Sequence, residues 1–348
     1  MAEFEGLEAV EARTQTYLPI IARALAAQKA APPADDASLV EGKVYRGKVR
    51  DVYSPAARDD VIVLVATGRQ SAFDRHLATV PFKGDVLNQV SAWWFEQTKD
   101  ITANHALGWP LPDVCLARRA VPFPIEFVVR AYITGSTDTS LWTHYKAGER
   151  NYCGLDFPDG LVKNQKLDKP VCTPTTKDAT HDAPIAPDDI VASGRMTREE
   201  WDYCAAKALA IFERGAALSA QRGLVLVDTK YEFGRVCLAD GSLGDIVLID
   251  EVHTPDSSRF WLAGTYAERF SAGQEPENID KEFLRLWYRE RCDPYADAEL
   301  PAAPDDLVCE LARRYVLLFE LITGQRFDFA AEARADPKAK LVAAIQQA

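Results

Sequence analysis

Two apolar runs that end in charged residues constrain the fold of this chain more than any other feature. The first, residues 224–232, ends with Asp228, Lys230 and Glu232 at alternate positions, and the second, residues 246–251, ends in two adjacent acids. Apolar, β-branched runs predict buried strands. Because side chains alternate across a strand, the three charged residues of the first run should share one face.

Charged groups at the ends of two buried strands predict a site for an ion or an anionic ligand. Charges are costly to bury unless they are paired or bound to ions. Mg²⁺ is typically held by one or two carboxylates together with nucleotide phosphates. Two neighbouring strands that both end in carboxylates around Lys230 therefore predict a metal–phosphate site. The alternative is a solvated sheet edge with ordinary ion pairs.

Bulk composition excludes several classes of function. The chain has 348 residues, 47% of them hydrophobic, with a net charge of -12 and a pI near 5.0. Sequence-independent nucleic-acid binding needs a basic face, so no nucleic-acid partner is expected. No apolar run reaches transmembrane length and the acidic N-terminus lacks the plan of a signal peptide. The seven cysteines form no Cys-x-x-Cys pair, so we expect a cytoplasmic protein with reduced thiols.

Local signals suggest how the chain is organised. Hydrophobic spacing predicts a helix over residues 7–29, and turn formers predict long loops over residues 145–190. A capping box at Thr197 begins a helix to about residue 221, and Gly324 ends another over residues 305–323. We expect four segments: an N-terminal helix with linker, a lobe with a glycine loop, a central ATP-grasp-like lobe, and C-terminal helices, at residues 1–38, 39–121, 122–265 and 266–348.

Gly47 and Lys48 lie between β-branched residues and follow Arg46. A glycine lets the backbone approach an anion and a lysine supplies a mobile positive charge, so this segment predicts a loop that closes over phosphates. The spacing is not that of a Walker loop. The alternative is an ordinary hairpin with a basic edge.

Arg130 ends an apolar strand and is followed by a turn that contains Gly135 and Ser136. The guanidinium offers a two-pronged fork for phosphate or carboxylate, and the serine adds a hydroxyl beside backbone N–H groups. The alternative pairs Arg130 with Glu126 and makes the glycine a plain turn.

Two further segments are polar without being specific. Residues 71–74 (Ser-Ala-Phe-Asp) fit an Asx turn as well as a site. Residues 173–182 hold two basic groups, Lys177 and His181, among threonines and aspartates. This second segment could bind a substrate carboxylate or form a solvated loop.

Together these segments resemble the SAICAR synthetase family, the phosphoribosylaminoimidazole-succinocarboxamide synthases of purine biosynthesis. The closest likeness lies in residues 47–53, 123–136 and 226–234, with support from residues 71–74, 87–95 and 249–261. The family often has Ser-Asp-Arg where this chain has Thr-Gly-Arg, so no acid can act at position 68. The first ~40 and last ~20 residues lie outside the resemblance.

The resemblance implies an α+β, ATP-grasp-like fold with antiparallel sheets in two lobes and a C-terminal helical segment. It implies an ATP-dependent ligase that joins L-aspartate to the carboxylate of carboxyaminoimidazole ribonucleotide (CAIR), giving SAICAR, ADP and phosphate. A carboxylate is a poor electrophile, so ATP would phosphorylate it before the amine attacks. Such phosphoryl transfer needs mainly positioning and charge neutralisation.

The resemblance also implies roles for individual residues. The predicted ATP contacts are Arg46, Gly47, Lys48, Lys230 and Glu232. The predicted Mg²⁺ ligands are Glu232 and Asp250, and the predicted catalytic pair is Lys230, between nucleotide and carboxylate, with Asp228 to orient it. The predicted substrate contacts are Arg130, Ser136, Arg259 and Asp256, of which the two arginines and the serine hold the ribonucleotide phosphate. Lys177 and His181 are added on their own chemistry, because a dicarboxylate substrate needs cationic partners.

Two other classes of function use the same features. A small-molecule kinase would share the glycine loop and the metal acids but would not need aspartate. A catalytically silent nucleotide-binding protein would have lost a metal acid, and none is missing. A monomer or small homo-oligomer without a membrane partner is expected in either case.

Overall fold

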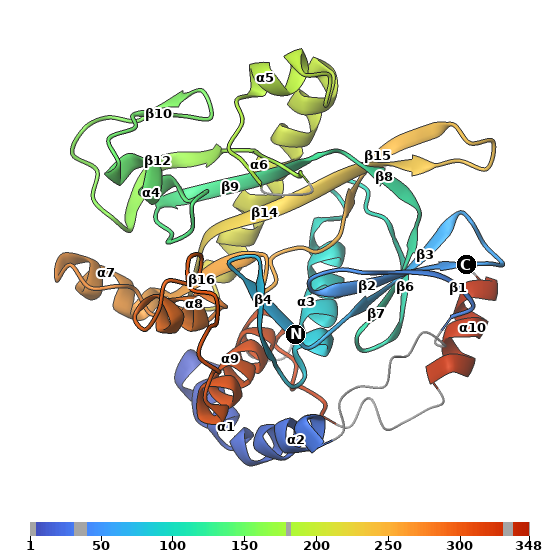
Figure 1. Cartoon of the computed structure of the whole chain (residues 1–348), viewed down its shortest axis with the longest axis horizontal. Coiled ribbons are helices and arrows are strands. Elements are labelled where there is room, and N and C mark those ends of the chain that lie inside the picture. The colour runs from blue at the N-terminus through green and yellow to red at the C-terminus, as the bar shows by residue number, and fades with distance from the viewer. Residues whose placement is uncertain (1–4, 31–39, 179–181, 330–336, 348) are drawn as a thin grey trace.

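The computed structural model describes residues 5–30, 40–178, 182–329 and 337–347. It confirms the predicted α+β class, because the strands form separate antiparallel sheets and helices fill the C-terminal part (Figure 1). None of the helices in these ranges is long and apolar enough to cross a membrane.

The N-terminal lobe is built on a five-stranded antiparallel sheet in the order β1-β2-β3-β7-β6. These strands are Gly42–Arg46, Arg50–Pro55, Val61–Ala66, Val114–Arg118 and Ala106–Leu111, respectively. A small hairpin, β4 (Arg69–Ala72) with β5 (Arg75–Thr79), leads into helix α3 (Lys83–Thr98). Val61 and Val63 of β3 are fully buried, as their β-branched run predicts.

The central sheet is organised around β14 (Leu224–Cys237), the longest strand. It pairs with β9 (Ile125–Ile133), β15 (Leu243–Ile249), β16 (Ser258–Leu262) and β8 (Ala120–Pro122). Strands β12 (Gln165–Cys172) and β13 (Thr175–Thr176) pair with β9. Helix α6 (Arg198–Ala220) covers one face, where Trp201 stacks on Phe127, so the opposite face is left for polar chemistry.

The remaining helices cover the two lobes. Helix α9 (Asp305–Thr323) is almost wholly buried, and α1 (Leu7–Gln15) and α2 (Leu18–Ala30) pack against it. Helix α10 (Pro337–Gln347) places Leu341 and Ile345 on the core of the N-terminal sheet. The short elements are α4 (Leu141–Lys146), β10 (Asn151–Tyr152), β11 (Leu155–Asp156), α5 (Pro187–Ala192), α7 (Ala263–Ser271) and α8 (Glu282–Arg289).

Of the local predictions of secondary structure, two are confirmed and two are wrong. The capping box at Thr197 and the left-handed stop at Gly324 (φ 69°) are confirmed. The single helix over residues 7–29 is wrong, because the chain forms two helices separated at Thr16 and Tyr17. Pro19 explains the break, since a proline inside one continuous helix would clash with the carbonyl four residues earlier. The loop expected over residues 145–190 is wrong where β12 forms; its polar sequence reflects its place at the sheet edge.

Candidate active site

The two carboxylates predicted to hold a metal lie at the ends of adjacent strands. Glu232 on β14 is paired in register with Ile249 on β15, and Asp250 follows directly. Arg50, which begins β2, donates from Nη1 to Asp250 at 3.1 Å and from Nη2 to Glu251 at 2.6 Å. The N-terminal lobe thus reaches the acids of the central sheet through one arginine.

The pKa values of Asp250 and Glu232 are shifted in opposite directions. Burial raises the pKa of Asp250 to about 6, with Glu232 and Glu251 adding to the effect against Arg50. Burial also opposes ionisation of Glu232, but Lys230 and Lys177 outweigh it and lower the pKa to about 2. Asp250 is therefore an acid whose charge is poorly compensated by the protein. A divalent cation beside Glu232 would supply that compensation.

Lys230 lies between two carboxylates on the open face of the sheet. Its Nζ is 2.8 Å from Glu126 and 2.9 Å from Glu232. Burial opposes the charge, but these acids raise the pKa of Lys230 well above its usual range, so the ammonium stays protonated. The hydrogen bonds of Asp228 go elsewhere, to Arg130 and Arg259, although the sequence predicted that Asp228 orients Lys230.

Arg130, Asp228 and Arg259 form one row across three strands. The registers pair Asp228 on β14 with Arg130 on β9 and with Arg259 on β16. Arg130 Nε also donates to Thr173 at 2.8 Å, and its Nη2 donates to the Thr139 carbonyl at 2.9 Å. Both guanidiniums are buried and fixed by the protein, as a preorganised anion site requires. Arg130 is not paired with Glu126 in the way the alternative proposed.

The turn after β9 brings Ser136 to the same region. Its hydroxyl donates to Glu282 at 2.6 Å, and Glu282 lies 3.5 Å from Arg259 Nε. Gly135 has φ 106°, and a Cβ there would lie 2.3 Å from Ser140 Oγ. Only glycine fits this turn beside Arg259. Sequence reasoning missed Glu282, although the charged run that opens α8 carried a signal for it.

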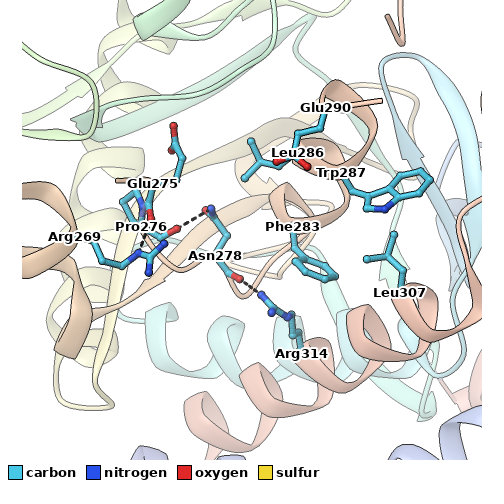
Figure 2. A pocket seen from close by; sticks show the side chains of 10 residues that line it. All are labelled: Arg269, Glu275, Pro276, Asn278, Phe283, Leu286, Trp287, Glu290, Leu307 and Arg314. Atoms are coloured by element: carbon cyan, nitrogen blue, oxygen red, sulfur yellow. Dashed lines mark hydrogen bonds between the residues drawn. The ribbon is translucent and has the colours of Figure 1, made fainter. Parts of the chain in front are cut away.

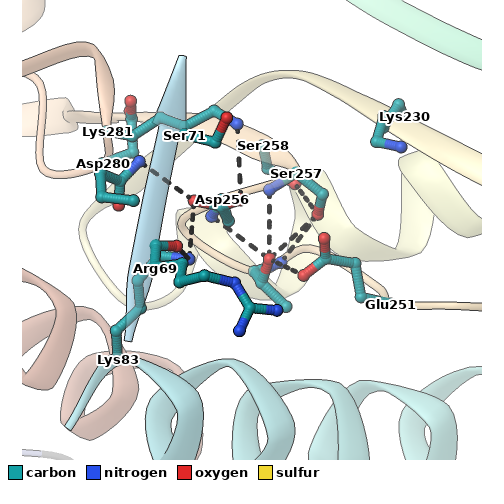
Figure 3. Close-up of polar contacts among 12 residues, drawn as sticks. Arg69, Ser71, Lys83, Lys230, Glu251, Asp256, Ser257, Ser258, Asp280 and Lys281 are labelled. Carbon is teal, nitrogen blue, oxygen red and sulfur yellow. Dashed lines mark hydrogen bonds and ion pairs between the residues drawn. The ribbon is translucent and has the colours of Figure 1, made fainter. Parts of the chain in front are cut away.

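Asp256 lies in a buried cluster with two lysines (Figure 3). Lys83 Nζ is 3.4 Å from one of its oxygens, and Lys281 Nζ is 3.6 Å from the other. Burial lowers the pKa of Lys281 to about 8, against the pull of Asp256. Tyr315 on α9 donates to Asp256 at 3.3 Å. Lys83 and Lys281 were not predicted; each stands at the start of a helix, where a cation is unusual.

The glycine loop joins β1 to β2 as a tight turn. Gly47 N donates to the Arg50 carbonyl at 2.8 Å, and a Cβ at Gly47 would lie 2.7 Å from that oxygen. Arg46 is held by Asp51 at 2.8 Å. Lys48 extends to Asp74 at 2.6 Å and is largely exposed, so its ammonium can reach a ligand. The structure therefore has both the hairpin of the alternative and the basic loop of the functional prediction.

The polar segment from residue 173 lies beside the acids. Thr173 is buried and accepts from Arg130, and Lys177 forms an ion pair with Glu232. His181, predicted as a substrate contact, lies outside the described residues.

The glycine at position 68, where the family often has an acid, has a steric reason. At Gly68, a Cβ would lie 2.9 Å from the Val80 carbonyl, which explains why the chain has no side chain there.

Metal ligation by protein groups alone is not available here. Within the described ranges, no group of three or more His, Cys, Asp or Glu residues could hold an ion. Two carboxylates completed by phosphate oxygens and water remain the donor set that the site offers, and this set suits Mg²⁺.

A separate cavity of about 280 Å³ lies between α8, α9 and residues 275–278 (Figure 2). None of the predicted site residues lines it. Arg269 and Arg314 both face it, but they donate to the carbonyls of Glu275 and Asn278. The predicted chemistry is therefore gathered on the central sheet, away from this cavity.

Known proteins of one family are similar to this chain in sequence and in fold. Residues 43–301 match the family model for SAICAR synthetase. A phosphoribosylaminoimidazole-succinocarboxamide synthase of Legionella pneumophila is 58% identical over 292 residues, covering 84% of this chain and 91% of that protein. A SAICAR synthase of Saccharomyces cerevisiae, solved in complex with SAICAR, has a TM-score of 0.69 and 27% identity, covering 85% of this chain and 99% of that one. A SAICAR synthetase solved in complex with ADP has a TM-score of 0.62 at 24% identity, covering 82% and 100%.

The fold and the site define the class first. An α+β fold that resembles ATP-grasp, with paired carboxylates, a charged buried lysine and an arginine row, is that of an enzyme that uses ATP to activate a substrate, and the family match makes it an ATP-dependent carbon–nitrogen ligase. Within that class, the family match over most of the chain is decisive. The chain belongs to the SAICAR synthetase family.

Proposed function

We propose that this protein joins L-aspartate to the carboxylate of CAIR with ATP, giving SAICAR, ADP and phosphate, as a step of de novo purine biosynthesis. The observation that carries the proposal is the layout of β14. Asp228 anchors the arginine row and Glu232 belongs to the acid pair, and the two lie four positions apart, about 13 Å along the strand. A ribonucleotide with its phosphate at one end and its reacting carboxylate at the other suits this spacing.

ATP would bind at the acid end of the site. Lys48 and Arg46, with the backbone at Gly47, would contact its phosphates, since this turn faces the acids through Arg50. Glu232 and Asp250 would hold Mg²⁺, whose chemistry is to neutralise phosphate charge during transfer. Lys230, fixed by Glu126 and Glu232, would stabilise charge on the carboxylate and the phosphoryl group.

CAIR would bind at the arginine end. Arg130 and Arg259 are held by Asp228, and Ser136 is held by Glu282, so these groups lose little freedom when a phosphate arrives. The guanidiniums supply charge and direction, and the hydroxyl supplies one further donor. Asp228 positions these arginines.

L-Aspartate would be bound by basic groups that are not assigned to ATP or CAIR. Lys177 lies at Glu232 beside the reacting centre, and we propose that Lys177 and His181 recognise a carboxylate of aspartate. Asp256, held between Lys83 and Lys281, completes the proposed substrate contacts. A closed segment over the site would also keep water from an acyl phosphate.

One assay separates this function from its alternatives. ADP release is measured with CAIR and MgATP, with and without L-aspartate. The ligase releases ADP in step with SAICAR only when aspartate is present. A small-molecule kinase would release ADP and a phosphorylated product without aspartate, and a silent binding protein would release none.

Three further expectations belong to this proposal. We propose a cytoplasmic location, a monomer or small homo-oligomer, and the four-segment division of the chain. Fractionation and light scattering test the first two, and limited proteolysis tests whether cleavage falls near residues 38, 121 and 265.

A further inference from the structure

A buried tyrosine–histidine pair lies behind the acids of the candidate site. Tyr231 stands between Lys230 and Glu232 on β14, so its side chain points to the opposite face of the sheet. Its hydroxyl is 2.5 Å from His253 Nε2, and both residues are fully buried. His253 belongs to the same short loop after β15 that carries Asp250.

His253 is fitted into a slot between α3 and α6. Trp94 of α3 packs edge-on against the imidazole, with ring centroids 4.6 Å apart. On the α6 side the neighbour is Gly215, where a Cβ would lie 2.1 Å from His253 Cε1. Any side chain at Gly215 would therefore displace the ring.

The loop that His253 anchors has an unfavourable backbone. Asp250 and His253 have φ values of 65° and 47°, in the left-handed region that non-glycine residues seldom adopt. Such conformations persist where the surrounding structure over-determines them, and they gather at functional sites. Val252, between them, donates its N–H to Ser91 of α3 at 3.4 Å, which adds a second tie.

We propose that Tyr231 and His253 are positioning residues that set Asp250 in place to hold Mg²⁺. Tyr231 ties the loop to the strand that carries Glu232, so the two acids keep one separation. Mg²⁺ demands near-octahedral geometry, and supporting contacts must hold ligands to a fraction of an ångström. This inference rests on the proposed function, and neither residue contacts a substrate.

The test measures metal binding directly. Free Mn²⁺ is followed by electron paramagnetic resonance during titration of the full chain in the presence of ADP. Tyr231→Phe removes the hydroxyl, and Gly215→Ala displaces the imidazole. We expect the Mn²⁺ dissociation constant to rise about tenfold in each variant.

Two matched variants serve as controls. Tyr145→Phe removes a buried tyrosine hydroxyl that donates to the Pro158 carbonyl, and Ser219→Ala alters α6 one turn beyond Gly215. Both should bind Mn²⁺ like the parent. CAIR affinity, measured by calorimetry, should stay at the parent value in Tyr231→Phe and Gly215→Ala. Raised Mg²⁺ should restore turnover in these two variants, which general damage to the fold would not allow.

The double variant of Tyr231 and Gly215 decides whether both act through His253. The Mn²⁺ dissociation constant of the double variant should equal the larger of the two single-variant values, because both substitutions act through the same imidazole ring. The inference is overturned if Tyr231→Phe binds Mn²⁺ like the parent, or if the two effects multiply in the double variant. It is also overturned if CAIR affinity falls by the same factor as Mn²⁺ affinity. A parent chain that fails to bind Mn²⁺ with ADP overturns the metal site as well. Normal parent binding with unaffected variants overturns the positioning role alone.

Discussion

Asp228 accepts a hydrogen bond from Arg130 at 3.3 Å, directly across the register of β9 and β14. The same oxygen accepts from Arg259 on the other side. One carboxylate oxygen therefore holds two buried guanidiniums.

Asp228→Asn should weaken this arrangement in two ways. The two arginines lose their shared negative charge, and breaking a buried ion pair costs about 3 kcal/mol of unfolding free energy. Their geometry also relaxes, so CAIR affinity should fall by more than about tenfold. Urea denaturation and calorimetry measure these effects. Asp202→Asn, at an exposed position of α6, should change neither; parent-like CAIR binding by Asp228→Asn would contradict the shared-carboxylate role.

Glu232→Gln and Asp250→Asn should each abolish most turnover while the protein stays folded. Either change removes one of the two charged oxygen donors proposed for Mg²⁺, and losing such transition-state stabilisation costs about 10²–10³ in rate. Steady-state assays at saturating Mg²⁺ measure the loss, and circular dichroism checks the fold. Asp245→Asn lies on β15 at an exposed position and should keep parent activity. Near-normal turnover of Glu232→Gln would refute the metal assignment.

Arg130→Lys should bind CAIR at least about tenfold more weakly than the parent, because lysine lacks the planar fork. The ammonium cannot reach Thr173, Thr139 and Asp228 together, as the guanidinium does. Calorimetry with CAIR, and separately with MgATP, should register a loss only for CAIR. Arg235→Lys, whose partner is Glu200, is the matched change on β14. Equal CAIR binding by Arg130→Lys would rule out two-pronged contact.

Replacing Lys177 and His181 together by alanine should raise the KM for L-aspartate. A dicarboxylate needs cationic partners, and Lys177 lies next to the acid pair. ATP hydrolysis should also separate from SAICAR formation, because water gains access to the acyl phosphate. Initial rates against aspartate and the ratio of ADP to SAICAR measure both effects. If both stay at parent values, residues 173–182 take no part in aspartate binding.

Lys281→Gln tests the buried lysine pair through pH. Burial lowers the pKa of Lys281 to about 8, so the folded chain releases this proton before the unfolded chain does. Parent stability therefore gains from this group as pH rises from about 8 towards the ordinary lysine value. Relative to the parent, the variant's free energy of unfolding should be highest at pH 7 and should fall by about 3 kcal/mol as pH rises from 8 past the ordinary lysine value. Lys43→Gln, at an exposed position, should show no such trend, and a constant difference across pH would contradict the assignment.

The sequence by itself determined the elements that carry the chemistry. Apolar runs ending in charges predicted the strands of Glu232 and Asp250, because alternation along a strand is a local property. The capping box at Thr197 and the glycine stop at Gly324 are local for the same reason. The motifs at residues 47–53, 123–136 and 226–234 predicted the family, and the comparisons confirm it.

Only the tertiary structure decided which residues surround those elements. Arg50 meets Asp250 and Glu251 some 200 positions later, and Lys83 meets Asp256 from another lobe. The local sequence around Tyr231 predicts only a strand residue. Its hydrogen bond to His253, and the contact of Gly215 with the imidazole, form only when the chain folds. No local pattern encodes such contacts, because they depend on how separate sheets and helices pack, and packing is a property of the whole chain.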